Sequence, residues 1–143
     1  MTKIFVLNGV NLGTLGERRP EIYGSLTLDD IYSQLSEEFP DVDFEFRQTD
    51  FEGEMVGFIR DCGAVDGLVI NPGAWTHYSY ALHDALEATT VPKVEVHLSN
   101  VHAREDWRRR SVISPSVNAV VAGMGAFSYA AAVKYILQCS TGS

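Results

Sequence analysis

Short apolar runs alternate with segments of helical periodicity along most of the chain, and this alternation limits the possible folds more than any other feature. Apolar residues recur at helical spacing in four segments, residues 28–39, 52–62, 79–88 and 128–138. The runs of strand length are residues 3–7, 42–48, 67–70, 93–98 and 117–123. Such alternation predicts an α/β protein in which helices cover both faces of a parallel sheet.

The number of expected strands narrows the topology further. For five parallel strands we expect the flavodoxin-like order 2-1-3-4-5. Residues 42–48, "VDFEFRQ", alternate strictly between apolar and polar, which is typical of a strand with one wet face at a sheet edge. Because no linker, repeat or low-complexity segment interrupts the pattern, residues 1–143 are expected to form a single domain.

Composition excludes several classes of partner. The formal net charge is −8, which disfavours binding to nucleic acid, although a few arginines can still build a positive pocket in an acidic protein. No apolar run approaches the roughly 20 residues that span a bilayer, so no membrane association is expected. The first residues do not resemble a signal peptide, and Cys62 and Cys139 are isolated, as expected for free thiols in the cytoplasm.

Polar side chains gather where the first, third and fourth expected strands end. In an open parallel sheet, ligands bind outside the carboxyl ends of the strands, where the strand order reverses. The two remaining strands end in segments that are poorer in reactive groups. The residues at the three central ends are Asn8, Asn11, Arg18, Arg19, Tyr23, Asn71, Thr76, His77, His97, Ser99 and Asn100. The sequence therefore predicts a site at this edge, and Glu95, in a buried strand, needs an imidazole or arginine partner there.

The segment 8–24 is long for a strand-to-helix loop and contains four glycines, which indicates either a lid over this site or an ordinary surface loop. Asn71 and Asn100 could equally be turn caps, and the run of arginines at 108–110 could be a solvated face. Neither a phosphate-binding glycine motif nor a metal-ligand or nucleophile-elbow motif is present in the sequence, so we expect no cofactor and no metal.

Four motifs connect the chain to a known family. They are "NGVNLGTLGERRPEIYG" from residue 8, "NPGAWTHYS" from residue 71, "VEVHLSNVHARE" from residue 94, and "WRRRS" from residue 107 followed by "GMGAFSY". On these motifs the chain resembles type II 3-dehydroquinate dehydratase over nearly its whole length. The resemblance implies a flavodoxin-like enzyme that removes water from 3-dehydroquinate to give 3-dehydroshikimate, without a metal or a covalent intermediate.

The resemblance also implies catalytic roles. Tyr23 matches the base, which works as a tyrosinate, and Arg18 matches the arginine whose charge favours that ionised form. Asn11 matches the residue that holds a water against the enolate oxygen. His97 matches the general acid that protonates the leaving hydroxyl, and Glu95 matches the carboxylate that orients it.

Substrate-binding residues carry over in the same way. Asn71, together with the backbone N–H groups of Leu98 and Ser99, matches the group that holds the substrate carboxylate. His77 and Arg108 match hydroxyl-binding residues, and Arg104 matches a neighbouring arginine with a structural or binding role. Asp84 matches an acid that reaches the active site of an adjacent subunit, because the family assembles as a homo-dodecamer, a tetramer of trimers.

The sequence departs from the family pattern at six positions: Val10, Arg19, Ala74, Trp75, Tyr78 and Arg110. None of these replaces a proposed catalytic group. Two functions of another class remain as alternatives. One is a flavodoxin-like binding or response-regulator module, and the other is a catalytically inactive sensor for a cyclic polyol acid.

Overall fold

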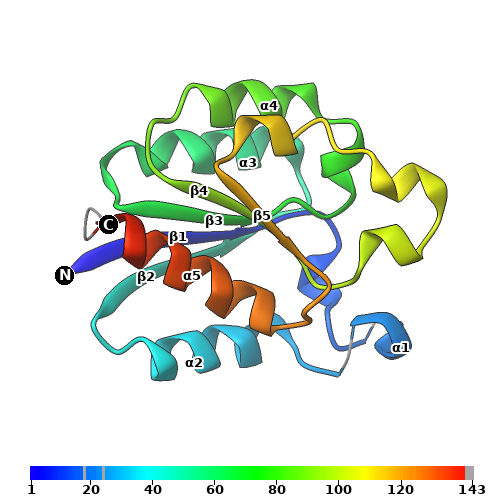
Figure 1. The fold of residues 1–143 in the computed structure, drawn as a ribbon, viewed down its shortest axis with the longest axis horizontal. Coiled ribbons are helices and arrows are strands. Elements are labelled where there is room, and N and C mark those ends of the chain that lie inside the picture. The colour runs from blue at the N-terminus through cyan, green and yellow to red at the C-terminus, as the bar shows by residue number, and fades with distance from the viewer. Residues whose placement is uncertain (18, 24, 141–143) are drawn as a thin grey trace.

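The computed structural model describes residues 1–17, 19–23 and 25–140, and it contains one sheet of five parallel strands in the order β2-β1-β3-β4-β5. This confirms the predicted fold class and strand order. The strands are β1 (Thr2–Asn8), β2 (Val42–Gln48), β3 (Gly67–Asn71), β4 (Lys93–His97) and β5 (Ala119–Ala122). Figure 1 shows the central strands running side by side, with their carboxyl ends on the right.

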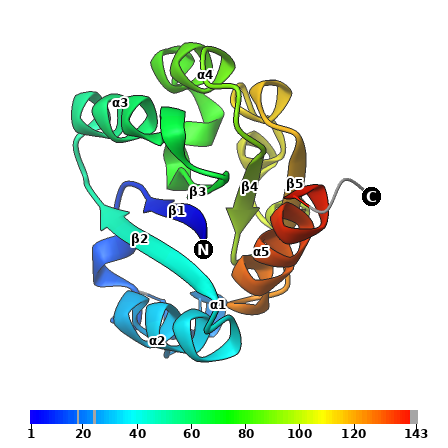
Figure 2. The same ribbon diagram turned by 90° about the vertical axis from the view of Figure 1, so that its left-hand side faces the viewer.

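Helices cover both faces of the sheet, and a separate apolar core lies on each. Figures 1 and 2 show α2 (Leu28–Glu38) and α5 (Phe127–Ser140) on one face, with α3 (Glu52–Arg60) and α4 (Tyr80–Glu87) on the other. On the α2–α5 side, residues such as Ile31 and Ile136 pack under Val69 and Val94. The α3–α4 side buries a second cluster that includes Met55, Leu82 and Ile70. Strands buried on both faces explain the continuous apolar runs of the sequence.

Helix starts follow the side-chain caps that the sequence offers. Thr27 and Asp30 form a reciprocal capping box at the start of α2. Ser79 caps α4 by accepting a hydrogen bond from the Leu82 N–H, so the expected helix 79–88 begins one residue later. The expected helix 52–62 ends earlier than its periodicity indicates, because the chain tightens after Arg60 into the 3-10 turn Asp61–Ala64.

The edge strand β2 is less exposed than its alternating pattern indicates. Phe44 and Phe46 pack against the core on one side, as expected. On the other side, the guanidinium of Arg47 lies 4.9 Å from the centre of the Phe5 ring and 5.1 Å from that of Phe58. The long arginine side chain therefore covers apolar surface while its charged end pairs with Asp61 at 2.8 Å.

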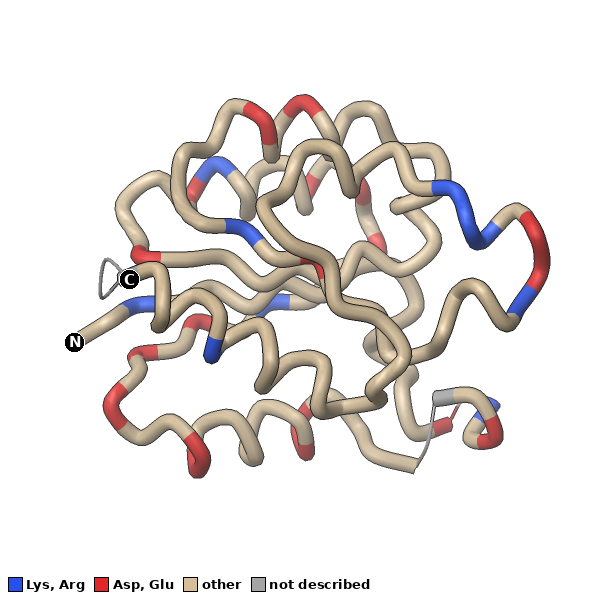
Figure 3. Tube along the Cα trace, viewed as in Figure 1, with Lys and Arg blue, Asp and Glu red and all other residues tan. Residues whose placement is uncertain are grey.

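Two segments extend beyond the carboxyl ends of the strands. The first follows β1 and contains the 3-10 turn Leu12–Thr14 and the short helix α1 (Pro20–Tyr23). The second is the β4–β5 connection, which contains only 3-10 turns: Val101–Ala103, Asp106–Arg109 and Ser114–Ser116. Figure 3 shows several basic positions on this connection next to a short acidic stretch, whereas the other acidic positions are spread along the chain.

A substitution at Gly67 tests how tightly β3 packs against α5. A Cβ atom at this position would overlap the Cγ2 methyl of Ile136, which is fully buried. Gly67→Ala should therefore lower the free energy of unfolding by about 1–3 kcal/mol, measured by urea denaturation.

Gly57→Ala is the matched control. A Cβ there meets nothing within 4 Å, and the position lies inside α3, so the substitution should stabilise by up to about 1 kcal/mol. Equal effects of the two substitutions would contradict this description of the β3–α5 contact.

Candidate active site

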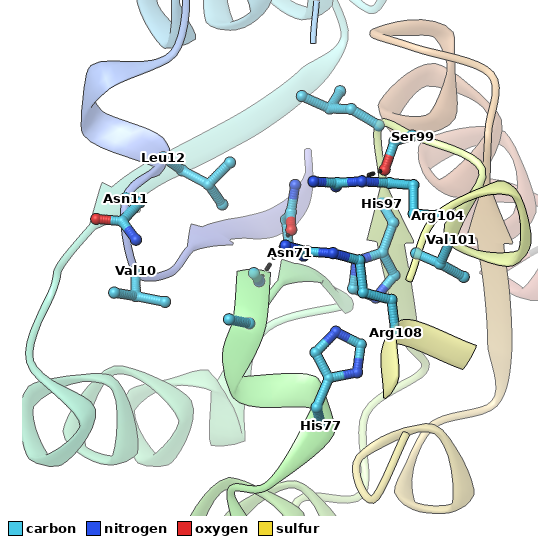
Figure 4. Close-up of a pocket in the computed structure, with 13 residues that line it drawn as sticks. Val10, Asn11, Leu12, Asn71, His77, His97, Ser99, Val101, Arg104 and Arg108 are labelled. Carbon is cyan, nitrogen blue, oxygen red and sulfur yellow. Dashed lines mark hydrogen bonds between the residues drawn. The ribbon is translucent and has the colours of Figure 1, made fainter. Parts of the chain in front are cut away.

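A cavity of about 230 Å³ lies at the carboxyl ends of the central strands, between the segment that follows β1 and the β4–β5 connection. Figure 4 shows its lining side chains converging from these segments and from the turn after β3. The lining residues are Val10, Asn11, Leu12, Asn71, Gly73, Ala74, His77, His97, Leu98, Ser99, Val101, Arg104 and Arg108. The cavity therefore lies where the strand-end argument predicts a site.

The lining of this cavity is basic in an otherwise acidic protein. Arg104, Arg108, His77 and His97 contribute to it, and among the described residues that line it there is neither Asp nor Glu. The chain as a whole has a formal net charge of −8. This contrast favours a small anionic ligand in the cavity, because partly enclosed positive charge attracts anions strongly even in an acidic protein.

His97 is paired with a carboxylate buried beneath it. The two residues lie on the same side of β4, and Nε2 of His97 is 2.5 Å from Oε2 of Glu95. Glu95 is fully buried, and it also accepts hydrogen bonds of 2.5 Å from the hydroxyls of Thr76 and Ser114. Burial by itself would raise the pKa of Glu95, but the hydrogen bonds and the charge of His97 outweigh it, and the pKa lies below its ordinary value.

The ionised Glu95 sets the tautomer of His97. A carboxylate can only accept, so Nε2 carries a proton in both protonation states of the ring. Nδ1 is then the nitrogen that can gain or lose a proton. The His97 side chain is 12% exposed and lines the cavity, which suits proton exchange with a bound molecule.

His77 has the opposite arrangement. Its Nδ1 lies 2.7 Å from the carbonyl oxygen of Arg110, and because that oxygen can only accept, Nδ1 is the donor. Burial, with the nearby charges of His97 and Arg108, lowers the pKa of His77 despite the bond to Arg110. A neutral His77 leaves Nε2 as an acceptor, suited to a hydroxyl group of a ligand.

Asn71 is held from below by a buried network. Its amide nitrogen donates to the Tyr129 hydroxyl at 3.0 Å, and its amide oxygen accepts from the Gly73 N–H at 3.1 Å. Tyr129 is fully buried and donates in turn to Asn8, whose amide nitrogen donates to Tyr32 at 3.1 Å. Burial raises the pKa of both tyrosines, that of Tyr32 to about 12, so both stay neutral. Asn71 is therefore fixed in one orientation at the cavity floor.

Both cavity arginines have neighbours that restrict them. Arg108 Nε donates to Glu105 Oε2 at 2.6 Å, and its guanidinium lies 4.0 Å from the centre of the Trp107 ring. Arg104 Nη1 donates to the Ser99 hydroxyl at 3.3 Å. These contacts reduce the rotamer freedom that each side chain would lose when an anion binds.

The structure brings most of the expected site residues together. Glu95 lies behind the cavity, and seven other expected residues line it: Asn11, Asn71, His77, His97, Leu98, Ser99 and Arg108. Asn100 instead caps the turn Val101–Ala103 through a bond from the His102 N–H, the simpler role considered for it.

The described part of the chain does not place the three other expected site residues, Arg18, Tyr23 and Asp84, at the cavity. Arg18 lies outside the described residues, and although Tyr23 is the last residue of α1, its side chain is outside them too. Asp84 lies in a different groove, between α3 and α4, where Val56 and Arg60 are among its neighbours. Of the family departures, Val10 and Ala74 line the cavity, whereas Trp75 is buried.

The sequence reasoning missed two serines. Ser111 bonds to Thr76, and Ser114 bonds directly to Glu95, at 2.5 Å in each case. The only signal was that "SVISPS" follows the arginine run of the "WRRRS" motif, and nothing in the sequence places the Ser114 hydroxyl against Glu95 or the Ser111 hydroxyl against Thr76.

Among the described residues, no group of three or more His, Cys, Asp and Glu side chains is arranged to hold a metal ion. Within the same part of the chain, no helix has the length and apolar character needed to cross a membrane.

Comparisons with known proteins agree with the resemblance seen in the motifs. Residues 2–137 match the family model for class II dehydroquinases. A 3-dehydroquinate dehydratase from Desulfitobacterium hafniense is 48% identical over 143 residues, covering 99% of each chain. One from Kineococcus radiotolerans is 53% identical over 138 residues, covering 94% of each. A type II dehydroquinase structure from Butyrivibrio crossotus superposes with a TM-score of 0.92 at 38% identity, covering 94% of this chain and 97% of the other.

The charge on Glu95 should appear in the pH dependence of stability. Its pKa in the folded protein is below the ordinary 4.5, so as the pH falls the unfolded chain takes up this proton first. The contribution of ionised Glu95 to the free energy of unfolding is present above about pH 4.5, and it is lost as the pH falls through the pKa of Glu95 in the folded protein. Between about pH 5 and 3, the free energy of unfolding should therefore fall less steeply for Glu95→Gln than for the unsubstituted protein.

Urea denaturation at several pH values measures these slopes. At pH 7 the same substitution should cost about 1–3 kcal/mol, because it disturbs a buried hydrogen-bonded group. Glu54→Gln, an exposed position on α3, is the control and should keep the original slope. An unchanged slope in Glu95→Gln would show that this carboxylate is not held ionised by its surroundings.

Proposed function

Because the chain belongs to the class II dehydroquinase family, we propose that it removes water from 3-dehydroquinate to give 3-dehydroshikimate. The observation that carries the proposal is the pair of His97 and buried Glu95 at the wall of a cavity lined by arginines. The substrate is an anionic cyclic ketone with several hydroxyl groups. Positive charge, hydroxyl acceptors and a positioned proton donor are the groups that its elimination needs.

In the proposed reaction, Tyr23 acts as a tyrosinate and abstracts the proton next to the ketone. The charge of Arg18 favours this ionised form, since a free tyrosine has a pKa of about 10. The resulting enolate is stabilised by a water held by Asn11. The enolate electrons then expel the hydroxyl, which leaves as water after His97 donates a proton to it. Tyr23 returns its proton to solvent and His97 takes one up, so the enzyme is restored.

The binding roles follow the cavity lining. Asn71 and the backbone N–H groups of Leu98 and Ser99 would hold the carboxylate, and His77 and Arg108 would bind hydroxyls. In support, Asn71 is fixed by Tyr129 and Gly73, and the neutral His77 presents an acceptor nitrogen. We take residues 1–143 as one catalytic domain that uses no cofactor.

A direct assay tests the activity. The product is a conjugated enone that absorbs in the ultraviolet, so turnover is followed by adding 3-dehydroquinate to purified protein. Tyr23→Phe removes the proposed base with little change in ring volume and should lower kcat by at least a thousandfold, with the fold intact by circular dichroism.

Tyr135→Phe, at an exposed position on α5, is the control and should retain activity. Full turnover by Tyr23→Phe would exclude Tyr23 as the base. Binding of 3-dehydroquinate without turnover by the unsubstituted protein would instead favour the inactive sensor of a cyclic polyol acid.

The two adjacent arginines provide a second test. Arg18→Ala should lower kcat by about a hundredfold or more, because it removes the charge that favours the tyrosinate. Arg19 is a departure from the family, and its Nε donates to Glu21 at 2.8 Å on the surface. Arg19→Ala should therefore change kcat less than about threefold. Equal losses would mean that the match of the "ERRP" stretch to the family motif is shifted by one residue.

We also propose that the protein is a homo-dodecamer of four trimers, in which Asp84 reaches the active site of a neighbouring subunit. In support, Asp84 lies away from the cavity of its own chain, and several large apolar side chains are exposed, among them Tyr78, Tyr80 and Trp107. A closed symmetric assembly would cover such surface.

Light scattering should give a mass near twelve times that of the 15.8 kDa chain. Asp84→Ala should lower activity although Asp84 does not line the cavity of its own subunit, where Asn71 and His97 lie. A fully active monomer or dimer would contradict both the dodecamer and the shared site.

A further inference from the structure

The hydroxyl groups of Thr76, Ser111 and Ser114 form a connected set around Glu95 that the proposed reaction does not use. Thr76 comes from the 3-10 turn Gly73–His77 (after β3), whereas Ser111 and Ser114 come from the β4–β5 connection. None of the three lines the cavity. They therefore cannot contact a ligand there, and any effect they have on it must pass through another residue.

The direction of each hydrogen bond in this set follows from the groups at its two ends. The Ser111 hydroxyl oxygen accepts from the backbone N–H groups of Ile113 at 3.1 Å and Ser114 at 2.9 Å. The single proton of Thr76 goes to Glu95, because an ionised carboxylate can only accept. Ser111, which is 2.5 Å from Thr76, must then donate to it. The chain runs from two backbone amides through Ser111 and Thr76 to Glu95.

Both oxygens of Glu95 are held in this way. Oε2 accepts from Thr76 and from His97, whereas Oε1 accepts from the Ser114 hydroxyl at 2.5 Å. A carboxylate bound on both sides cannot rotate about its last bond without breaking at least one hydrogen bond. Hydrogen bonds that run in one direction also polarise one another, which strengthens each of them.

We infer that Thr76, Ser111 and Ser114 are positioning residues, which hold Glu95 in the orientation that fixes the ring of His97 and its Nε2–H tautomer. This inference rests on the proposed function for its kinetic consequence but not for its structural one. Loss of a hydroxyl would let the carboxylate rotate, and His97 would then present Nδ1 to the leaving hydroxyl in the right geometry for less of the time.

The matched substitutions at Thr76 separate the hydroxyl from its packing. Thr76→Val keeps the shape and removes the hydroxyl, whereas Thr76→Ser keeps the hydroxyl. Thr76→Val should lower kcat by about 10–100-fold with KM changed less than about twofold, as expected for a residue that orients a catalytic group without contacting substrate. Thr76→Ser should keep kcat within about threefold of the original.

Two serines provide an independent variant and its control. Ser114→Ala removes the donor to the other oxygen and should show the same loss in kcat alone. Ser116→Ala removes a buried hydroxyl from the same 3-10 turn, but this one donates to the Ile113 carbonyl and does not contact Glu95, so kcat should be unchanged. The two segments stay joined in all these variants by the backbone bond from Val112 N–H to the Thr76 carbonyl at 2.7 Å.

Proton NMR of the His97 ring tests the inference without any substrate. The Nε2–H proton, held against a buried carboxylate, should give a slowly exchanging downfield signal in the unsubstituted protein and in Thr76→Ser. The signal should be broadened by solvent exchange in Thr76→Val and Ser114→Ala.

Failure of the unsubstituted protein to turn over 3-dehydroquinate would contradict the proposed function, and the NMR signal would still decide the positioning role. The inference is overturned if Thr76→Val and Ser114→Ala both keep the signal. It is overturned equally if Thr76→Ser loses the signal and kcat as fully as Thr76→Val.

Discussion

The site depends on the ionised carboxylate of Glu95, which is fully buried. A buried carboxylate is costly unless it is paired and hydrogen-bonded. Here three donors from three segments of the chain meet it: His97 on its own strand, Thr76 after β3, and Ser114 in the β4–β5 connection. The hydrogen bonds that offset the burial of this charge therefore also hold the turn after β3 and the β4–β5 connection against the sheet.

The sheet supplies the geometry in which this can occur. Because all the strands are parallel, the ends of β1, β3 and β4 lie at one edge, and Asn8 and Asn71 are direct neighbours in the register. The β4–β5 connection has no α-helix, and its 3-10 turns lie across that edge. A single crossover thus places two kinds of residue. One is Ser114, which bonds to Glu95, and the others are the cavity residues of this connection, including Arg104 and Arg108.

The sequence is enough to predict the strand order, the helices on both faces and the edge of the sheet at which the cavity lies. These properties follow from periodicity, from the number of strands with one alternating edge strand, and from the polar residues at three strand ends. The sequence also predicts that Glu95 needs an imidazole or arginine partner, because an acid between Val94 and Val96 on a buried strand is costly alone, and the structure shows that the partner is His97. The sequence does not predict the hydroxyl groups that bond to Glu95. Thr76 and Ser114 come close to it only because of the conformations of the turn after β3 and of the β4–β5 connection.

In the proposed reaction, His97 donates the proton to the leaving hydroxyl after a separate step has formed the enolate. The most direct test is to follow His97→Asn in heavy water, comparing deuterium uptake next to the ketone of 3-dehydroquinate with formation of the enone. We expect this variant to incorporate deuterium while enone formation is nearly lost, because proton abstraction does not need His97. Loss of both, or enone formation at the original rate, would contradict this mechanism.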